Sequence, residues 1–215
     1  EKYFKIIKYK DLKAKVLDFG CGDLKLLSYL RERNINCHGY DNNESIYDLN
    51  YFNFFKDYVH IGDIEKLENK FDVIILNQVI EHIQDPLRLF KILSELLNNE
   101  GIVIIETPNT NCIQFKLFKE NAIHLDSPRH RILYNKKNLL QIAEKYQFKN
   151  IMTNNGFNKL DYPLSFFKSL NSRLKSNEIS FLEKLLLVFI SLFIYFYYQF
   201  FSKNHQSFGL ILKKF

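Results

Sequence analysis

The chain has 215 residues, 47% hydrophobic and 16% aromatic, which is enough to bury the core of one domain and excludes a disordered protein. Its formal charge of +6 is spread along the sequence without a block of Lys and Arg, so nucleic acid is not an expected partner. The three Cys residues are far apart and form no CxxC pair, which predicts reduced thiols in a cytoplasmic protein and neither disulfides nor a zinc site.

Short apolar runs alternate with segments of helical periodicity in the first half of the chain. Pro86 is expected to open a helix, because proline is well suited to the first helical turn. The alternation predicts a parallel sheet with helices on both faces, which is a doubly wound α/β fold. Strands are predicted at Val16–Phe19, Asn36–Tyr40, Tyr58–Ile61, Phe71–Leu76 and Ile102–Glu106, and helices at Asp23–Arg33 and Pro86–Asn98.

The pattern changes after Tyr134. A helix is predicted at Lys136–Tyr146 and a strand at Lys149–Asn154, and the last strand is expected only at Ser207–Leu212. The roughly fifty residues between these two strands are too many for a structureless connection and suggest a functional element. We therefore expect one domain made of residues 1–157 and 206–215, interrupted by an apolar helical insertion at 158–205.

A short glycine-bearing stretch, VLDFGCG, covers residues 16–22. Gly20 and Gly22 follow the first predicted strand, at the sheet edge where parallel α/β proteins bind ligands. Glycine there lets a ligand approach the backbone closely. The spacing matches neither the dinucleotide fingerprint GxGxxG nor a P-loop. Asp18, two residues before the first glycine, suits a cofactor that carries a positive charge and an amine better than one that carries phosphates.

VLDFGCG resembles the first motif of the class I S-adenosylmethionine-dependent methyltransferases. Four further segments resemble later motifs of that family in the same order, namely GYD, HIGDIEKL, FDVIILNQVIEHIQDP and GIVIIETPN. EHIQDP followed by ETPN is most similar to the branch of ubiquinone-type O-methyltransferases and methyltransferases of glycan gene clusters. The resemblance covers roughly residues 14–157 and the last strand. It implies a Rossmann-like sheet of seven strands, an antiparallel final pair and S-adenosylmethionine as cofactor.

The resemblance also implies roles for individual residues. Asp41 would bind the ribose hydroxyls, and Asp63 would face the adenine amine. An Asp at a strand end is otherwise commonly a helix cap or turn residue, and that alternative stays open. Leu24 departs from the family, which often has a third glycine at this position, and raises the alternative of a degenerate module. The predicted cofactor-binding residues are Asp18, Gly20, Cys21, Gly22, Asp41, Asn42, Asp63, Ile64 and Asn77.

Three histidines are candidates for the chemistry. Methyl transfer from a sulfonium mainly needs alignment, but a hydroxyl acceptor also needs a base, and histidine is the usual base near neutral pH. His124 and His130 lie in the segment after the fifth predicted strand, and we expect the first to be the base and the second to position the substrate. His82, beside Glu81, is the third candidate. Each could instead order the loop or cap a helix, and no spacing demands a metal.

LLLVFISLFIYFYYQFF, residues 185–201, contains no charged residue. Seventeen residues are near the lower limit for a membrane span. A single crossing would also place the last strand on the wrong side of the bilayer. A helix buried against the sheet or in a dimer interface and a helix dipping into one leaflet are the other interpretations. Residues 158–206 carry six Lys and Arg against three Asp and Glu, a balance of +3 that suits an anionic surface. Peripheral membrane contact through residues 181–201 is predicted.

The sequence thus predicts methyl transfer to an oxygen of a small metabolite or glycan precursor, with a lipid-linked acceptor included. One alternative is an O-methyltransferase of a polyprenylated quinone precursor, and the other is a non-catalytic module that binds S-adenosylmethionine at the membrane. The expected location is the cytoplasm, including the cytoplasmic face of a membrane. No signal peptide is recognisable, although the chain begins at Glu1 and not at Met. The oligomeric state stays open.

Overall fold

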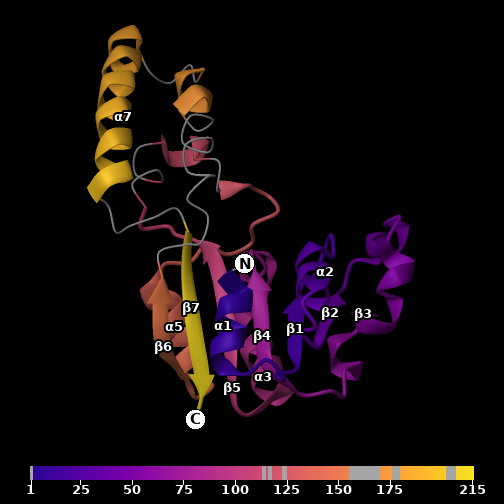
Figure 1. Ribbon diagram of the computed structural model, residues 1–215. Coiled ribbons are helices and arrows are strands. Elements are labelled where there is room, and N and C mark those ends of the chain that lie inside the picture. Colours follow the sequence, from indigo (N-terminus) through magenta and orange to yellow (C-terminus); the bar gives the residue numbers. More distant parts are fainter. Residues whose placement is uncertain are drawn as a thin grey trace.

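The computed structural model describes residues 2–112, 115, 118–122, 125–154, 170–175, 180–201 and 207–215. The strands in these ranges are β1 (Val16–Phe19), β2 (Cys37–Asp41), β3 (Val59–Ile61), β4 (Phe71–Asn77), β5 (Leu97–Pro108), β6 (Phe148–Asn154) and β7 (Ser207–Lys214). They form one sheet in the order β3-β2-β1-β4-β5-β7-β6 (Figure 1). Pairing is parallel from β3 to β5, whereas β7 is antiparallel to both β5 and β6. This confirms the predicted doubly wound, mostly parallel sheet of seven strands.

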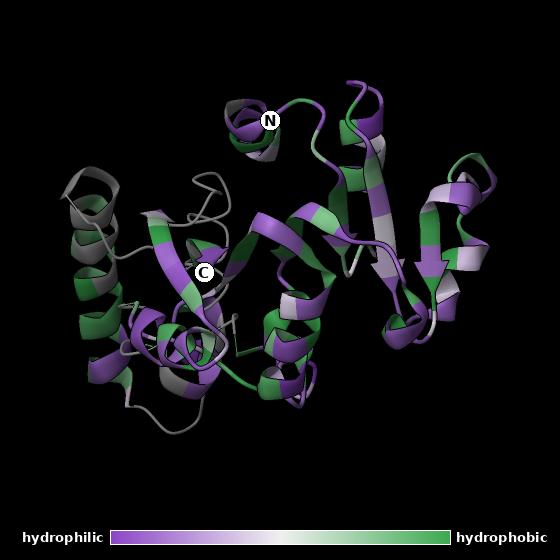
Figure 2. Cartoon of the chain, turned by 90° about the horizontal axis from the view of Figure 1, so that it is seen from below, coloured by the Kyte–Doolittle hydropathy of each residue, from purple (hydrophilic) through white to green (hydrophobic). Residues whose placement is uncertain are grey.

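Helices cover both faces of the sheet, as predicted. The described helices are α1 (Lys2–Lys10), α2 (Lys25–Arg31), α3 (Pro86–Leu96), α5 (Lys136–Glu144) and α7 (Phe181–Phe201), with short 3-10 turns between them. Side chains of α3 and α5 pack on one face of the sheet, and side chains of α1 and α2 pack on the other. Figure 2, seen from below, shows the helix that carries the N-terminus apart from the rest, on one side of the sheet. The central strands are buried on both faces, so most of their residues are apolar, with Asp18 in β1 as a buried exception.

Local signals set most element boundaries, and tertiary pairing changes some of them. α3 begins at Pro86, and the Asp85 carboxylate caps it by accepting a hydrogen bond from the Arg88 N–H at 2.9 Å. The helix ends at Leu96 and not at Asn98 as predicted, because Leu97 is buried and pairs with β4. α2 likewise begins at Lys25, two residues later than predicted.

α1 is an element that the sequence patterns did not predict. Tyr3 and Ile7 lie one helical turn apart, and both are buried against the sheet. Two further apolar residues of this helix, Phe4 and Ile6, are partly buried against the same cluster. The i, i+4 spacing was the available signal, but nine residues are too few for a confident helix without knowledge of what they cover.

The described part of the insertion shares a small core, called here the small core of the insertion, with the segment that follows β5. Phe118, Ala122 and Leu170 are buried together, and Leu174 and Leu187 pack against them. α7 begins at Phe181, four residues before the uncharged run, and extends beyond the end of the sheet (Figure 1). Within the described ranges, no helix is both long and apolar enough to cross a membrane.

Candidate functional site

The glycine loop after β1 has a left-handed backbone. Gly20 and Gly22 have φ angles of 75° and 44°. A Cβ on Gly20 would lie 2.6 Å from Cγ2 of Val79, so only glycine lets the loop approach the segment after β4. Leu24 also has a positive φ, 56°, and its side chain is fully buried against the sheet. The leucine that replaces the family's third glycine is therefore accommodated as a core residue, at the expense of some backbone strain.

Asp41, at the end of β2, holds the glycine loop in place. Its two carboxylate oxygens accept hydrogen bonds at 2.9 Å, one from the Gly22 N–H and one from the Asn43 N–H. Asp63 accepts a hydrogen bond from the Glu65 N–H at 3.0 Å and so caps a 3-10 turn. Both acids thus have the structural role that was the alternative. A carboxylate accepts about four hydrogen bonds, so each keeps capacity for a ligand.

Two cavities, of about 720 and 830 Å³, meet at Gly20. Both volumes lie in the range of small-molecule sites. All nine predicted cofactor-binding residues line one or both of them, although their role stays a prediction. The first cavity is lined by Gly20, Asp41, Asn42, Asp63 and Ile64, and the second by Asp18, Gly20, Cys21, Gly22 and Asn77. His82, Ile83 and Arg88, of which only His82 was singled out in the sequence, also line the first cavity.

Asp18 is the most unusual of these residues. It is 3% exposed, and its Oδ2 atom has no hydrogen-bond partner within the described ranges. Burial raises the pKa of Asp18 to about 7; a hydrogen bond from the Leu27 backbone lowers it in part, and the carboxylates of Asp23 and Asp41 raise it further. A buried carboxylate oxygen without a donor, beside a cavity, matches a ligand that brings a protonated amine. The amino acid end of S-adenosylmethionine carries such an amine, so the residues present fit that cofactor.

The opposite wall of the second cavity comes from α1. The Tyr3 hydroxyl lies 2.9 Å from Oε2 of Glu106 and 3.0 Å from Oδ1 of Asn77, and Lys2 forms an ion pair with the same glutamate. Glu106, at the end of β5, is 3% exposed. Burial, followed by the Glu106 charge, raises the pKa of Tyr3. These contacts join the N-terminal helix to the carboxyl ends of two central strands and close the cavity on that side.

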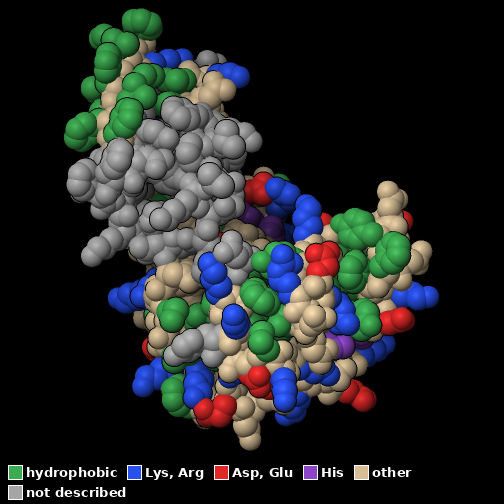
Figure 3. Space-filling view, in the orientation of Figure 1, with side chains coloured by type: hydrophobic (Ala, Val, Ile, Leu, Met, Phe, Trp, Pro, Cys, Tyr) green, Lys and Arg blue, Asp and Glu red, His purple; other side chains and the backbone are tan. Residues whose placement is uncertain are grey.

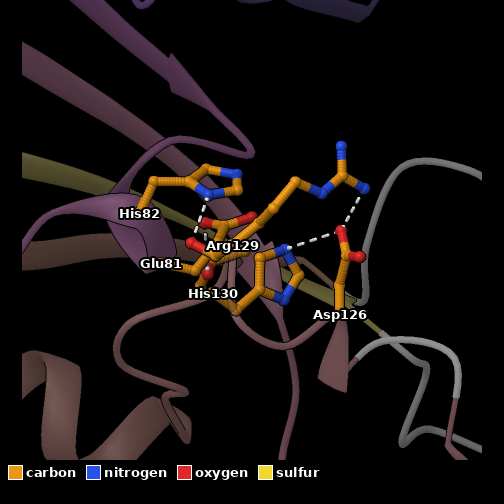
Figure 4. A network of polar contacts seen from close by, with 6 residues as sticks. Glu81, His82, Asp126, Arg129 and His130 are labelled. Atoms are coloured by element: carbon orange, nitrogen blue, oxygen red, sulfur yellow. Dashed lines mark hydrogen bonds and ion pairs between the residues drawn. The ribbon is translucent and has the colours of Figure 1, made fainter.

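A second polar cluster lies at the far rim of the first cavity (Figure 4). Nδ1 of His82 is 3.0 Å from the backbone oxygen of Arg129, so in the neutral ring Nδ1 carries the proton and Nε2 is unprotonated. The ring centroids of His82 and His130 are 4.9 Å apart. Nε2 of His130 lies 3.9 Å from Oδ2 of Asp126. Two of the three candidate histidines are therefore side by side, although 48 positions separate them in the sequence.

Glu81 completes this cluster from beneath. It is fully buried, and burial is the main cause that raises its pKa. Its Oε2 atom accepts a hydrogen bond from the Thr107 hydroxyl at 2.9 Å, whereas Oε1 has no partner within the described part of the chain. The Glu81 backbone oxygen accepts hydrogen bonds from the N–H groups of Arg131 and Ile132, which attach the loop that carries His130 to the 3-10 turn Ile80–His82 that follows β4.

The cluster combines groups that can take up a proton with groups that can bind a cation. One ligand atom from each of Glu81, His82 and His130 lies within 4.8 Å of the others. His124, the predicted base, lies outside the described residues. The sequence interpretation treated Glu81 only as a neighbour of His82, and its burial beneath the imidazole pair becomes visible only in the fold.

Comparison with known proteins gives the chain a family. A family model described as "Methyltransferase domain" matches residues 2–153. The comparison with curated proteins found no match. The solved structures that are similar to this chain include a SAM dependent methyltransferase from Archaeoglobus fulgidus, with 24% identity, a TM-score of 0.62, and coverage of 99% of this chain and 91% of that one.

Two further similar structures contain S-adenosylhomocysteine (SAH). One is coclaurine N-methyltransferase bound to N-methylheliamine and SAH, with 15% identity, a TM-score of 0.63, and coverage of 99% of this chain and 71% of that one. The other is magnesium protoporphyrin IX methyltransferase from Synechocystis PCC 6803, with 13% identity and a TM-score of 0.62. The match covers 99% of this chain and 80% of that one. At these identities the likeness shows the fold.

Proposed function

Because this chain belongs to the methyltransferase-domain family and is a class I S-adenosylmethionine-dependent methyltransferase, we propose that it methylates an oxygen of a small metabolite or glycan precursor. The observation that carries the proposal is the position of His82. This residue lines the cavity that contains Asp41 and Asp63, and its unprotonated Nε2 faces away from the Arg129 carbonyl. A hydroxyl acceptor needs such a base, whereas an amine or thiolate acceptor has less need of one.

The nine predicted residues would hold S-adenosylmethionine along the two cavities. Asp18 would bind the amine, Asp41 the ribose hydroxyls and Asp63 the adenine amine, and Gly20 would let the ligand pass between the cavities. When bound, the cofactor supplies a methyl group on a positively charged sulfur, which is a good leaving group. The protein's contribution is then alignment of the acceptor and removal of its proton.

The imidazole pair would remove that proton. His82 Nε2 would accept the proton of the acceptor hydroxyl, so that the acceptor oxygen could take the methyl group that the cofactor would supply. The buried Glu81, whose Oε1 has no donor among the described residues, would stabilise the imidazolium. His130 packs on His82 and would position the ring. His124 stays a second candidate for the base on the sequence alone.

The test is an activity assay with the full chain, S-adenosylmethionine and three acceptors: an isoprenoid phenol, a nucleotide sugar and a lipid-linked glycan. We expect His82→Gln to lower kcat by ~10²–10⁴-fold, because glutamine cannot take the proton, and to leave SAH affinity unchanged. His38→Gln, a matched change of a partly exposed histidine in β2, should keep full activity.

Two results would contradict the proposed base. Full activity of His82→Gln on a hydroxyl acceptor is the first. Loss of native activity in EDTA, with recovery on added Zn²⁺, is the second, because a cation of this kind matches Glu81, His82 and His130 as ligands. The three acceptors also distinguish a glycan precursor from a polyprenylated quinone precursor as the substrate. Methylation of the isoprenoid phenol alone would favour the quinone precursor.

A further inference from the structure

α7 exposes a broad apolar surface. Figure 3 shows these hydrophobic side chains gathered on the helix, away from the sheet. Their exposed fractions run from 40% for Ile190 to 78% for Phe181, whereas large side chains in the core are below about a tenth exposed. The exposed set is Phe181, Leu182, Leu185, Leu186, Phe189, Ile190, Leu192, Phe193 and Phe196.

This apolar surface covers about half of the helix circumference. Successive residues of an α-helix are ~100° apart, and at that spacing all nine exposed residues fall on one half of the helix. The other half holds Leu187, which packs against the small core of the insertion. The helix is therefore fixed in rotation, with its back attached to the protein and a wide apolar front facing outward.

The width of the exposed apolar surface distinguishes between two partners that could cover it, a second copy of the helix and a lipid leaflet. A second copy of the helix in a coiled coil would cover only a narrow a/d stripe, and most of these nine side chains would stay in water. A lipid leaflet covers the whole half-cylinder. The insertion region carries the net charge of +3 already noted. This charge is complementary to an anionic lipid surface.

We propose that the exposed face of α7 lies in one leaflet of an anionic membrane, parallel to the surface. Helices that bind in this way bury their apolar face at the boundary between head groups and acyl chains. The insertion then acts as a membrane-docking element, and the sheet domain with its two cavities stays on the water side.

The docking element is attached directly to the loop beside the candidate site. Arg173, from the helical turn at 170–174, forms an ion pair with Glu120, and the Ser172 hydroxyl donates a hydrogen bond to Oδ1 of Asn121 at 3.0 Å. A few residues later the same loop carries Asp126 and His130. Membrane contact would therefore present the acceptor side of the site to the lipid surface, and the acceptor would be lipid-linked; this second step rests on the proposed function.

The experiment is flotation of the full chain with vesicles of phosphatidylcholine, with and without phosphatidylglycerol. We expect binding to the mixed vesicles and a fall of at least ~100-fold in partitioning for Phe189→Glu/Phe193→Glu, because two buried aromatic side chains are lost from the lipid. Phe54→Glu is the matched control, since Phe54 is 79% exposed but lies on the opposite part of the molecule, near β3. Calorimetric titration with SAH should show that all variants keep a folded cofactor site.

Three outcomes would overturn the proposal. The native chain could stay in the aqueous fraction with both vesicle types. The α7 variant and the Phe54 control could lose binding equally. A dimer in light scattering, lost in the α7 variant and unaccompanied by flotation, would assign the face to a second copy. None of these outcomes bears on methyl transfer to water-soluble acceptors, so failure here is distinguishable from failure of the proposed function.

Discussion

At the scale of residues, the candidate site contains two buried carboxyl groups that destabilise the fold. Asp18 and Glu81 are both buried, and each has a carboxylate oxygen without a partner among the described residues. An unsatisfied buried polar atom destabilises the fold by about 1–3 kcal/mol. Such groups are retained where a ligand or reaction needs them. Their positions beside the two cavities therefore support a functional role for both residues.

Asp18→Asn should stabilise the protein at high pH and weaken SAH binding. The folded-state pKa of Asp18 is about 7, above the ordinary value of 3.8. The stability linked to this group is therefore fully present below pH 3.8 and is lost as the pH rises through 7. Asparagine does not titrate, so the free energy of unfolding of Asp18→Asn, relative to that of the native chain, should rise by roughly 4 kcal/mol between pH 3.8 and 7. Urea unfolding of both proteins at several pH values measures this difference.

The same variant should bind SAH ~10–100-fold more weakly, because it loses a charge-assisted hydrogen bond to the ligand amine. Asp57→Asn, a change of an exposed acid, serves as the control for both measurements. A stability difference between Asp18→Asn and the native chain that does not vary with pH would contradict the assigned pKa. Unchanged SAH affinity would remove Asp18 from the cofactor site.

At the scale of elements, α1 joins the core and the site. Its apolar side contributes Tyr3 and Ile7 to the core, and its first turn contributes Lys2 and Tyr3 to the contacts with Glu106. Nine residues of helix have little stability alone, and packing supplies it. The helix thus forms only because the sheet beneath it has formed, and in turn it closes the second cavity.

Ile7→Ala should destabilise the protein by about 2–4 kcal/mol, because the side chain is fully buried and leaves a cavity. Lys8→Ala, on the exposed side of the same helix, should change stability by less than ~0.5 kcal/mol. Chemical unfolding of both variants measures the difference. Equal, small effects would mean that α1 is not docked as described.

At the scale of the whole molecule, the described residues of the insertion pack apart from the core of the sheet. Among the described side chains of α7, none belongs to the two clusters that flank the sheet, and Leu187 packs in the third cluster. The sheet includes β7, which follows the insertion in sequence and pairs with β5 over seven residues. We therefore expect the sheet to fold without α7.

Deletion of Phe181–Phe201 should leave the sheet domain folded. Among the described residues, the contact that is lost is the one between Leu187 and the small core of the insertion. The variant should therefore keep its far-ultraviolet circular dichroism, corrected for the deleted helix, and its SAH affinity within ~3-fold. The fluorescence of an added apolar dye should not rise. Unfolding of the variant would show that α7 is needed by the sheet and would favour the buried-helix interpretation.

The sequence by itself determined the sheet, the glycine loop and the family. An apolar strand, a helix that starts at proline and a glycine turn each depend on a few neighbouring residues, so each can be recognised in the sequence alone. What only the tertiary structure decided depends on contacts between distant segments. These are the docking of α1, the pairing of His82 with His130 above Glu81, and the burial of an Asp18 oxygen that has no donor in the described part of the chain. It also decided which half of α7 is covered. Apolar residues occur all round this helix, so its sequence does not predict which side packs against the protein, and the contact of Leu187 with the small core shows it.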